Sequence, residues 1–406
     1  MTDDLPTLTA EQTAERLGIK LETLYAYVAR GRLSRTRTVT GSAFDPLEVE
    51  RFAASRRHRS AAAPSSARGR SDGRPLMVIE TNFALIDDDE LYYRGRDATQ
   101  LAATASFETV AHWALTGEWV EAARFTARAA VVDARTVASL LPAAATSRDR
   151  QQVAVTVLAA ADPLRYSLEA ESVVTATEAL VAGMVEVLPA VGAEAGPSIA
   201  ERLWSRLTPR ESTAAALTAL DAALVLLIDH DVAISTLAAR AAASARASPF
   251  AVVTAGLGAL DSPLHGNASR AAQGMLSRVV AGEHPERVIA DTMASGRTAI
   301  PGFGQLLYRG IDPRARRLFE LLHEIPDAAS TVEAVERIDI VVADRTGSRP
   351  NVDLALAALT HATGMADDAG EVVFATARTV GWVVHALDEY SRAPLRLRPV
   401  GRYTAP

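Results

Sequence analysis

The chain has 406 residues, 49% of them hydrophobic and only 5% aromatic, and its formal net charge is −7. This length suffices for two or three domains and a large core built mainly from Ala, Leu and Val. The abundance of alanine with helical periodicity predicts a mostly α-helical fold. There is no Cys, which excludes disulfide bonds, thiolate metal sites and a Cys nucleophile, and we expect no metal centre.

The N-terminal part is basic, whereas the rest of the chain is acidic. Residues 1–75 carry 13 basic and nine acidic side chains, and the remaining residues carry a net charge of −11. The first predicted elements lie in this basic part. Helices at 9–17 and 20–30 flank a turn at Gly18, and a third helix begins at 45 and continues through 52. Two short helices joined by a tight turn are typical of a helix-turn-helix unit.

Residues 1–57 are therefore predicted to form a small DNA-binding domain, which we call the head. Its arginines cluster directly after the second helix, which favours nucleic-acid binding over a protein-interaction module with a solvated basic face. The head resembles the MerR and excisionase-like winged helix family over about fifty residues, which implies contacts with duplex DNA. The predicted DNA-binding residues are Lys20, Thr23, Tyr25, Arg30, Arg32, Arg35 and Arg37.

Residues 58–75 are predicted to be a flexible linker, because Ala, Ser, Pro, Gly and Arg dominate them without apolar periodicity. Such a tether leaves the head free to orient and gives it little direct leverage on the rest of the chain. The segment from residue 76 onward, which we call the body, opens with short strands at 77–80 and 91–93. Helices are then predicted at 107–115, 121–141, 148–161, 168–188, 198–207 and 213–228.

The best candidate for a membrane-spanning stretch lies in this helical region, and Asp221 and Asp229 interrupt it. We therefore expect no contact with a membrane. The N-terminus, residues 1–4, is acidic rather than the basic start of a secretion signal. A cytoplasmic location is the expectation.

Four segments in the second half of the chain point to chemistry. Residues 262–269 form a loop that leads into a helix, where free N–H groups favour an anion. A Gly-rich turn at 300–309 precedes further arginines. The segment 350–353 places a carboxylate at a helix start, and 377–382 contains one Arg within an apolar run. An Arg in such a place is costly to bury unless an anion meets it.

The order and wording of these four segments resemble the citrate synthase family, from about residue 80 to the C-terminus. The resemblance implies a large helical domain at 76–270 and 371–406 and a small helical domain at 271–370, both of which follow the winged helix-turn-helix domain predicted for the head. It further implies an acyltransferase that condenses acetyl-CoA, or a close acyl-CoA, with oxaloacetate to form citrate. The coenzyme A thioester is then a substrate, and no permanently bound cofactor is expected.

The resemblance also assigns catalytic roles. Asp353 matches the family's catalytic carboxylate, which takes the α-proton, and His265 matches the histidine that stabilises the enol. The alternative for Asp353 is a carboxylate that only caps the helix behind it. Gln305 stands where the family has a histidine that acts as an acid. An amide can donate a hydrogen bond but cannot deliver a proton, and loss of a general acid typically costs about 10²–10⁴ in rate.

The remaining matches bind substrate. Arg314, Arg378 and Arg398 match the arginines that clamp the carboxylates of oxaloacetate and citrate, and planar guanidinium groups suit bidentate contacts with such carboxylates. His230 matches a histidine that contacts the same substrate. In the family the equivalent of Arg398 reaches the neighbouring subunit's site, which implies a homodimer. Arg309 falls near the family's coenzyme A site. For each Arg the alternative is a structural salt bridge.

Three hypotheses remain open. The first is a citrate synthase-like enzyme, weakened by Gln305 or adapted to another keto acid. The second is a DNA-binding transcriptional regulator whose body senses a carboxylate or an acyl-CoA, which the head and Gln305 favour. The third is a bifunctional protein. Retention of Asp353 favours the enzyme, because a pure binding module has no need of a base.

Overall fold

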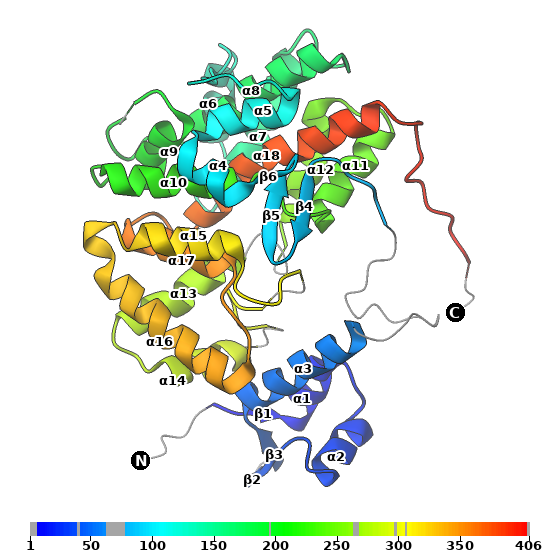
Figure 1. Ribbon diagram of the computed structural model, residues 1–406, viewed down its shortest axis with the longest axis vertical. Coiled ribbons are helices and arrows are strands. Elements are labelled where there is room, and N and C mark those ends of the chain that lie inside the picture. Colours follow the sequence, from blue (N-terminus) through cyan, green and yellow to red (C-terminus); the bar gives the residue numbers. More distant parts are fainter. Residues whose placement is uncertain are drawn as a thin grey trace.

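The computed structural model describes residues 6–38, 41–61, 78–194, 196–262, 268–295, 299–304 and 307–403. The described chain is mostly helical, which confirms the predicted class, and it contains two small three-stranded antiparallel sheets. Figure 1 shows three parts: a large helical part, a smaller helical part below it, and the head at the bottom.

The head contains three helices and one of the sheets. Thr9 caps the first helix with its side chain, and Gly18, at φ 60°, ends it in the left-handed region that favours glycine. The sheet has the strand order β1-β3-β2. The elements are β1 (Leu8–Thr9), α1 (Ala10–Leu17), α2 (Leu21–Ala29), β2 (Thr36–Thr38), β3 (Gly41–Phe44) and α3 (Pro46–Ala61).

The third helix differs from its prediction. We expected it to continue through residue 52 before a linker at 58–75, but α3 extends to Ala61 and so includes the first residues of that segment. Residues 62–77, which hold the rest of the predicted linker, lie outside the described residues.

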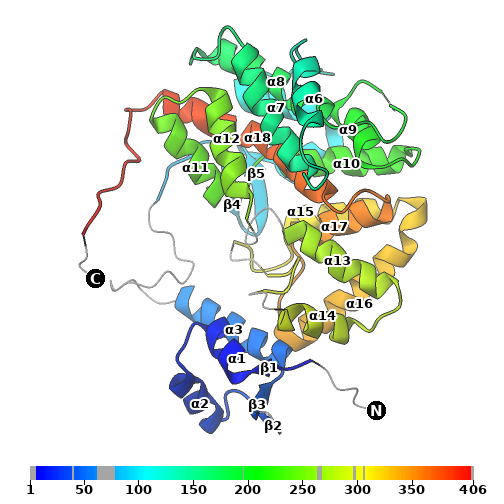
Figure 2. The same ribbon diagram turned by 180° about the vertical axis from the view of Figure 1, so that it is seen from behind.

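The head is docked on the body, which contradicts the expectation of little direct leverage. Helix α3 lies beside two helices of the smaller part, as both views show (Figures 1 and 2). Leu47 on α3 is 1% exposed and belongs to the hydrophobic core of the body rather than that of the head. The apolar residues of α3 indicate burial in the sequence, but not the surface that buries them.

The large part holds the second sheet and most of the helices. Its elements are β4 (Ala84–Asp87), β5 (Glu90–Tyr93), β6 (Arg96–Asp97), α4 (Ala98–Thr104), α5 (Phe107–Thr116), α6 (Val131–Ser139), α7 (Ser147–Ala161), α8 (Ala170–Glu186), α9 (Ile199–Leu207), α10 (Ala214–Leu226), α11 (Ile234–Ser244), α12 (Pro249–Leu260) and α18 (Ala369–Tyr390). Helix α18 runs through the middle and packs against α11, α12 and α8, so nearly all of its side chains are buried. Its apolar run reflects this central position.

The smaller part consists of α13 (Ala268–Val280), α14 (Pro285–Ala294), α15 (Pro313–Leu322), a 3₁₀ turn (Pro326–Ala328), α16 (Ala329–Thr346) and α17 (Val352–Ala362). Helix α17 packs between α13 and α15, and α10 of the large part packs on α15. One hydrophobic cluster therefore continues through both parts of the body. Among the described residues, no helix combines the length and the apolar character that crossing a membrane requires.

Two sequence predictions in the large part are wrong. The helix expected at 121–141 is confined to α6, because tertiary contacts hold the preceding segment in an irregular path. Arg202 donates to the carbonyl of Phe125 at 2.5 Å, and Arg128 forms an ion pair with Asp162. The strand expected at 77–80 is absent from its described residues, 78–80.

Gly381 on α18 permits a close backbone approach that shapes the body. A Cβ atom built there would lie 2.0 Å from the carbonyl oxygen of Ile228. Only glycine therefore lets the turn after α10 lie directly on α18. That turn leads into the pocket described below.

Replacement of Gly381 by Ala should lower the free energy of unfolding by about 3 kcal/mol or more, because rigid backbone faces the new methyl group. Thermal unfolding would measure the loss. Gly258 on α12 is the matched control: no atom lies within 4 Å of its built Cβ, so Gly258→Ala should stabilise the helix by about 1 kcal/mol. Equal effects of the two substitutions would contradict the prediction.

Candidate active site

A pocket of about 250 Å³ lies between the two parts of the body. The turn after α10 and one face of α18 line it from the large part, and the starts of α13, α15 and α17 line it from the smaller part. The lining residues are His230, Asp231, Val232, Ala233, Ala268, Leu307, Asp312, Arg314, Asn351, Val352, Asp353, Phe374 and Arg378. Four of the residues predicted to act on substrate thus meet in one place.

Arg378 is a buried cation on α18, with 1% of its surface exposed. Its Nε donates to the carbonyl of Leu227 at 2.9 Å, and its guanidinium carbon lies 4.6 Å from the centre of the Phe374 ring. Within the described part of the chain, neither terminal nitrogen has a hydrogen-bond partner. Burial lowers the pKa of Arg378 to about 10, so the group remains charged at neutral pH. A planar pair of free donors suits a carboxylate.

Arg314 is held by a carboxylate within its own helix start. Asp312 caps α15, and Arg314 donates to it through Nε at 3.0 Å and Nη2 at 2.7 Å. Burial alone would lower the pKa of Arg314, but the charge of Asp312 raises it overall. Asp312 also accepts from the backbone N–H of Val352 at 3.2 Å, so it ties the start of α15 to the start of α17.

Asp353 lies in the first turn of α17 without serving as its cap. The N-cap is Asn351, whose side chain accepts from the N–H of Asp353 at 3.0 Å. This removes the alternative in which Asp353 only caps the helix. Burial raises the pKa of Asp353 to about 6; Arg314 opposes this shift, Asp312 adds to it, and Arg378 opposes it. The carboxyl group therefore titrates close to neutral pH, which suits a general base.

His230 follows directly after the turn that rests on Gly381. Its Nε2 lies 2.9 Å from the hydroxyl oxygen of Tyr308. Burial, with Arg314 and Arg378 nearby, lowers the pKa of His230 well below its ordinary value. The imidazole is therefore neutral at neutral pH and can donate one hydrogen bond without adding charge to the pocket.

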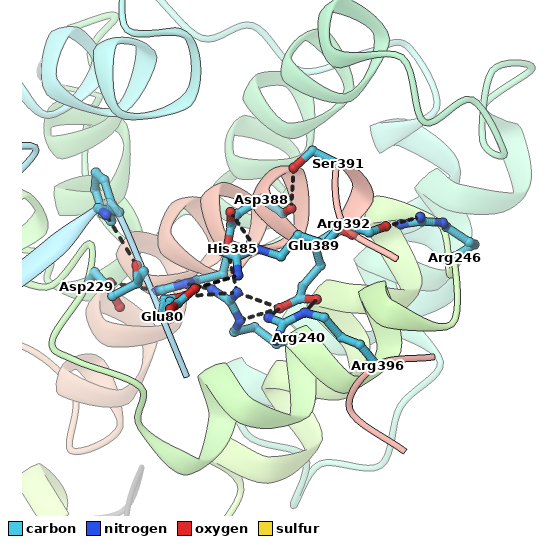
Figure 3. Close-up of polar contacts among 12 residues, drawn as sticks. Glu80, Asp229, Arg240, Arg246, His385, Asp388, Glu389, Ser391, Arg392 and Arg396 are labelled. Atoms are coloured by element: carbon cyan, nitrogen blue, oxygen red, sulfur yellow. Dashed lines mark hydrogen bonds and ion pairs between the residues drawn. The ribbon is translucent and has the colours of Figure 1, made fainter. Parts of the chain in front are cut away.

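A buried chain of hydrogen-bonded polar groups supports the turn after α10 (Figure 3). The Nε2 of His385 lies 2.9 Å from Asp229 Oδ2, and its Nδ1 lies 2.7 Å from Nη1 of Arg240. Because a guanidinium group only donates, Nδ1 must accept and Nε2 must carry the proton donated to Asp229. Arg240 also donates to Glu389 at 2.7 Å. The chain therefore fixes the residue that precedes His230.

Sequence reasoning missed two sets of residues here. It left Asp312 and Tyr308 without a role, although an Asp-Pro pair before a helix is a recognisable cap signal for Asp312. It also missed the Asp229–His385–Arg240 chain. No local signal predicts that chain, because its members come from α11, α18 and the turn after α10.

Two other predicted site residues, Arg309 and Arg398, are described and do not line the pocket. Arg309 is exposed, and its backbone N–H donates to Asp89 at 2.7 Å. Arg398 is exposed on the segment that follows α18, which extends away from the body in Figure 1. His265 and Gln305 lie outside the described residues.

This fold and pocket define a two-part helical protein with a polar pocket between its parts, lined by two buried arginines. The chain belongs to the citrate synthase family: the family described as "Citrate synthase, C-terminal domain" matches residues 74–400. The citrate synthase of Haloferax volcanii is 28% identical over 361 residues, which cover 81% of this chain and 94% of that protein. Citrate synthase 2 of Bacillus subtilis is 32% identical over 211 residues, which span 51% of this chain and 56% of that protein.

Other similar proteins extend this picture. The 2-methylcitrate synthase 2 of Corynebacterium glutamicum is 26% identical over 345 residues, 78% of this chain and 89% of that protein. The citrate synthase of Thermoplasma acidophilum was solved in ternary complex with carboxymethyl coenzyme A and oxaloacetate. It shares the fold with a TM-score of 0.71 at 23% identity, over 84% of this chain and 97% of that one.

The raised pKa of Asp353 makes stability depend on pH in a specific direction. Because the folded-state pKa lies above the ordinary value of 3.8, ionisation disfavours the fold, and the penalty grows as pH rises from about 4 through 6. Asp353→Asn should therefore stabilise the protein more at pH 7.5 than at pH 4.5. Thermal unfolding of both proteins at the two pH values measures this. The same difference at both pH values would contradict it.

Proposed function

We propose that this protein is a citrate synthase-type acyltransferase that condenses acetyl-CoA, or a close acyl-CoA, with oxaloacetate. The observation that carries the proposal is the buried guanidinium of Arg378, which lines the same pocket as Asp353 and whose two terminal nitrogens have no hydrogen-bond partner among the described residues. A cation in this place stabilises the fold poorly by itself, but it binds a carboxylate well. Family membership supports the reaction class.

The roles follow from charge and position. The carboxylates of oxaloacetate bind Arg378 and Arg314, and neutral His230 donates a hydrogen bond to the same substrate. Ionised Asp353 removes a proton from the carbon next to the thioester carbonyl, and the resulting enol or enolate attacks the keto carbon. The new carbon–carbon bond gives a citryl thioester, and water then releases coenzyme A and citrate. By the family resemblance, His265 stabilises the enol oxygen.

Gln305 bears on the protonation of the keto oxygen. An amide can polarise that oxygen through a hydrogen bond, but it has no proton to transfer. The proposed enzyme is therefore slow with oxaloacetate. Arg398 contributes to the neighbouring site of a homodimer in this proposal, Arg309 lies near coenzyme A, and the enzyme acts in the cytoplasm. The exposed, extended position of Arg398 fits a reach toward a second copy.

The assay is thiol release from acetyl-CoA with oxaloacetate, made with wild type, Gln305→His and Arg378→Met. Restoring a proton donor should raise kcat by about 10²–10⁴-fold in Gln305→His. Arg378→Met should weaken oxaloacetate binding by about 10²-fold, measured by calorimetry, because it removes both free donors. If wild type and Gln305→His neither release thiol nor bind oxaloacetate, the proposed function is wrong.

We propose DNA binding by the head as a second function, because the orientation of the docked head favours it. Helix α3 faces the body, whereas α2 and the β2–β3 hairpin point away from it in both views (Figures 1 and 2). All seven predicted DNA-binding residues are exposed; they are Lys20, Thr23, Tyr25, Arg30, Arg32, Arg35 and Arg37. The Arg35 guanidinium lies 5.9 Å from the ring centre of Tyr25. A basic face of this kind is available to phosphates.

Full-length protein should bind duplex DNA with an affinity that falls steeply as salt rises, because bound phosphates release counterions. Arg35→Ala and Arg37→Ala should each weaken binding and reduce the salt slope by about one. Fluorescence anisotropy at salt concentrations from about 50 to about 200 mM measures both the affinity and its salt dependence. Arg278→Met on α13 is the control and should change neither. No binding even at low salt would remove this function.

A further inference from the structure

The contact between head and body reaches the segment that carries Asp353. Helix α3 packs against α16 and α14. Leu47 of the head is buried in the core of the body, and Ala294 of the body packs against the core of the head. Nη2 of Arg16 also lies 3.5 Å from the sulfur of Met293. The two cores interlock, so the head has a defined position on α14 and α16.

Arg345, in the last turn of α16, is the polar centre of this interface. Its Nη2 lies 2.5 Å from Oδ2 of Asp45, and its backbone carbonyl accepts from Nε of Arg51 at 2.6 Å. Both partners belong to the head. Asp45 also caps α3, since it accepts from the N–H of Leu47 at 2.9 Å. The head therefore holds Arg345 by both its side chain and its main chain.

Asp353 follows Arg345 by eight positions, and backbone contacts hold the chain between these two residues in place. Gly347, at φ 74°, ends α16, and the next residues pair with 302–304. Arg349 accepts through its carbonyl from the N–H of Gly304 at 2.9 Å. Asn351 donates its N–H to the carbonyl of Gly302 at 2.9 Å and its side-chain amide to that of Gly304 at 3.1 Å.

This pairing leaves no slack at the start of α17. Gly302, at φ 78°, lies so close to Leu354 that a Cβ built on it would come within 2.7 Å of the Leu354 Cβ. Asn351, which makes two of the pairing contacts, is also the N-cap of α17. If Arg345 moves, residues 346–352 must move with it, because they are packed and hydrogen-bonded to 302–304. The first turn of α17, which holds Asp353, then moves as well.

We propose that Arg345 is a positioning residue, through which the docked head holds residues 345–353 in the arrangement that places Asp353 in the pocket. Head docking and carboxylate binding are thereby coupled. Coupling is reciprocal, so a carboxylate in the pocket strengthens docking by the same factor by which docking strengthens its binding. The second statement rests on the proposed function, whereas the positioning itself does not.

Hydrogen exchange of the ligand-free full-length protein tests the positioning. Asp45→Asn removes the charge that meets Arg345 but keeps a good capping side chain for α3. The amides of 348, 349 and 351–354 should exchange at least about five-fold faster than in wild type, while those of α1 and α2 remain unchanged. Arg278→Met is the matched control: Arg278 has the same side-chain exposure as Arg345, 36%, and lies in the same part of the body. Unchanged exchange at 348, 349 and 351–354 in Asp45→Asn would overturn the proposal.

Oxaloacetate binding, measured by calorimetry, tests the coupling. Asp45→Asn and Arg345→Met should each raise the Kd about five-fold or more, and the double variant should add little, because both break one interaction. Arg278→Met should match wild type. Wild-type affinity in both interface variants, or fully additive losses, would overturn the coupling. If wild type binds no oxaloacetate, the coupling fails, the thiol-release assay decides the proposed function, and the exchange experiment alone decides the positioning.

Discussion

The rest of the site depends on a guanidinium group buried in an apolar helix. Arg378 lies on α18, most of whose side chains are apolar, and removing its charge from water costs several kcal/mol or more. The carbonyl of Leu227 and the Phe374 ring offset part of that cost. The terminal nitrogens still lack a hydrogen-bond partner in the described structure. A buried guanidinium group of this kind is suited to bind an anion.

The remaining architecture brings other groups to this cation from separate directions. Gly381 lets the turn with His230 lie on α18, and Asp312 joins the starts of α15 and α17 so that Arg314 and Asp353 face the same space. The two parts of the body each contribute to the pocket, and neither forms it alone. The fold therefore assembles the site from residues more than a hundred positions apart in the sequence.

Much of the pocket could be predicted from the sequence, because several of the side chains that line it lie within short, recognisable motifs. An Arg within an apolar run and a carboxylate at a helix start are visible as letters, and Arg378 and Asp353 do line one pocket. Contacts between distant elements could not be predicted. The sequence gives no partner for Leu47, and nothing near His385 in sequence indicates that Asp229 and Arg240 bind its two ring nitrogens. The irregular path before α6 depends on Arg202, far along the chain, and so escapes periodicity.

Two of the aspartates that line the pocket, Asp312 and Asp353, differ in what their carboxyl groups contact. The Asp312 carboxylate caps the start of α15, accepts from Nε and Nη2 of Arg314 and accepts from the N–H of Val352, so it ties these elements together. Asp353 does not cap its own helix, because Asn351 is the N-cap of α17. The amide side chain of Asn351 thus satisfies the start of α17 in place of the Asp353 carboxyl group. If Asn351 were replaced by a residue that cannot cap a helix, the Asp353 carboxyl group would have to accept hydrogen bonds from the unpaired N–H groups at the start of α17.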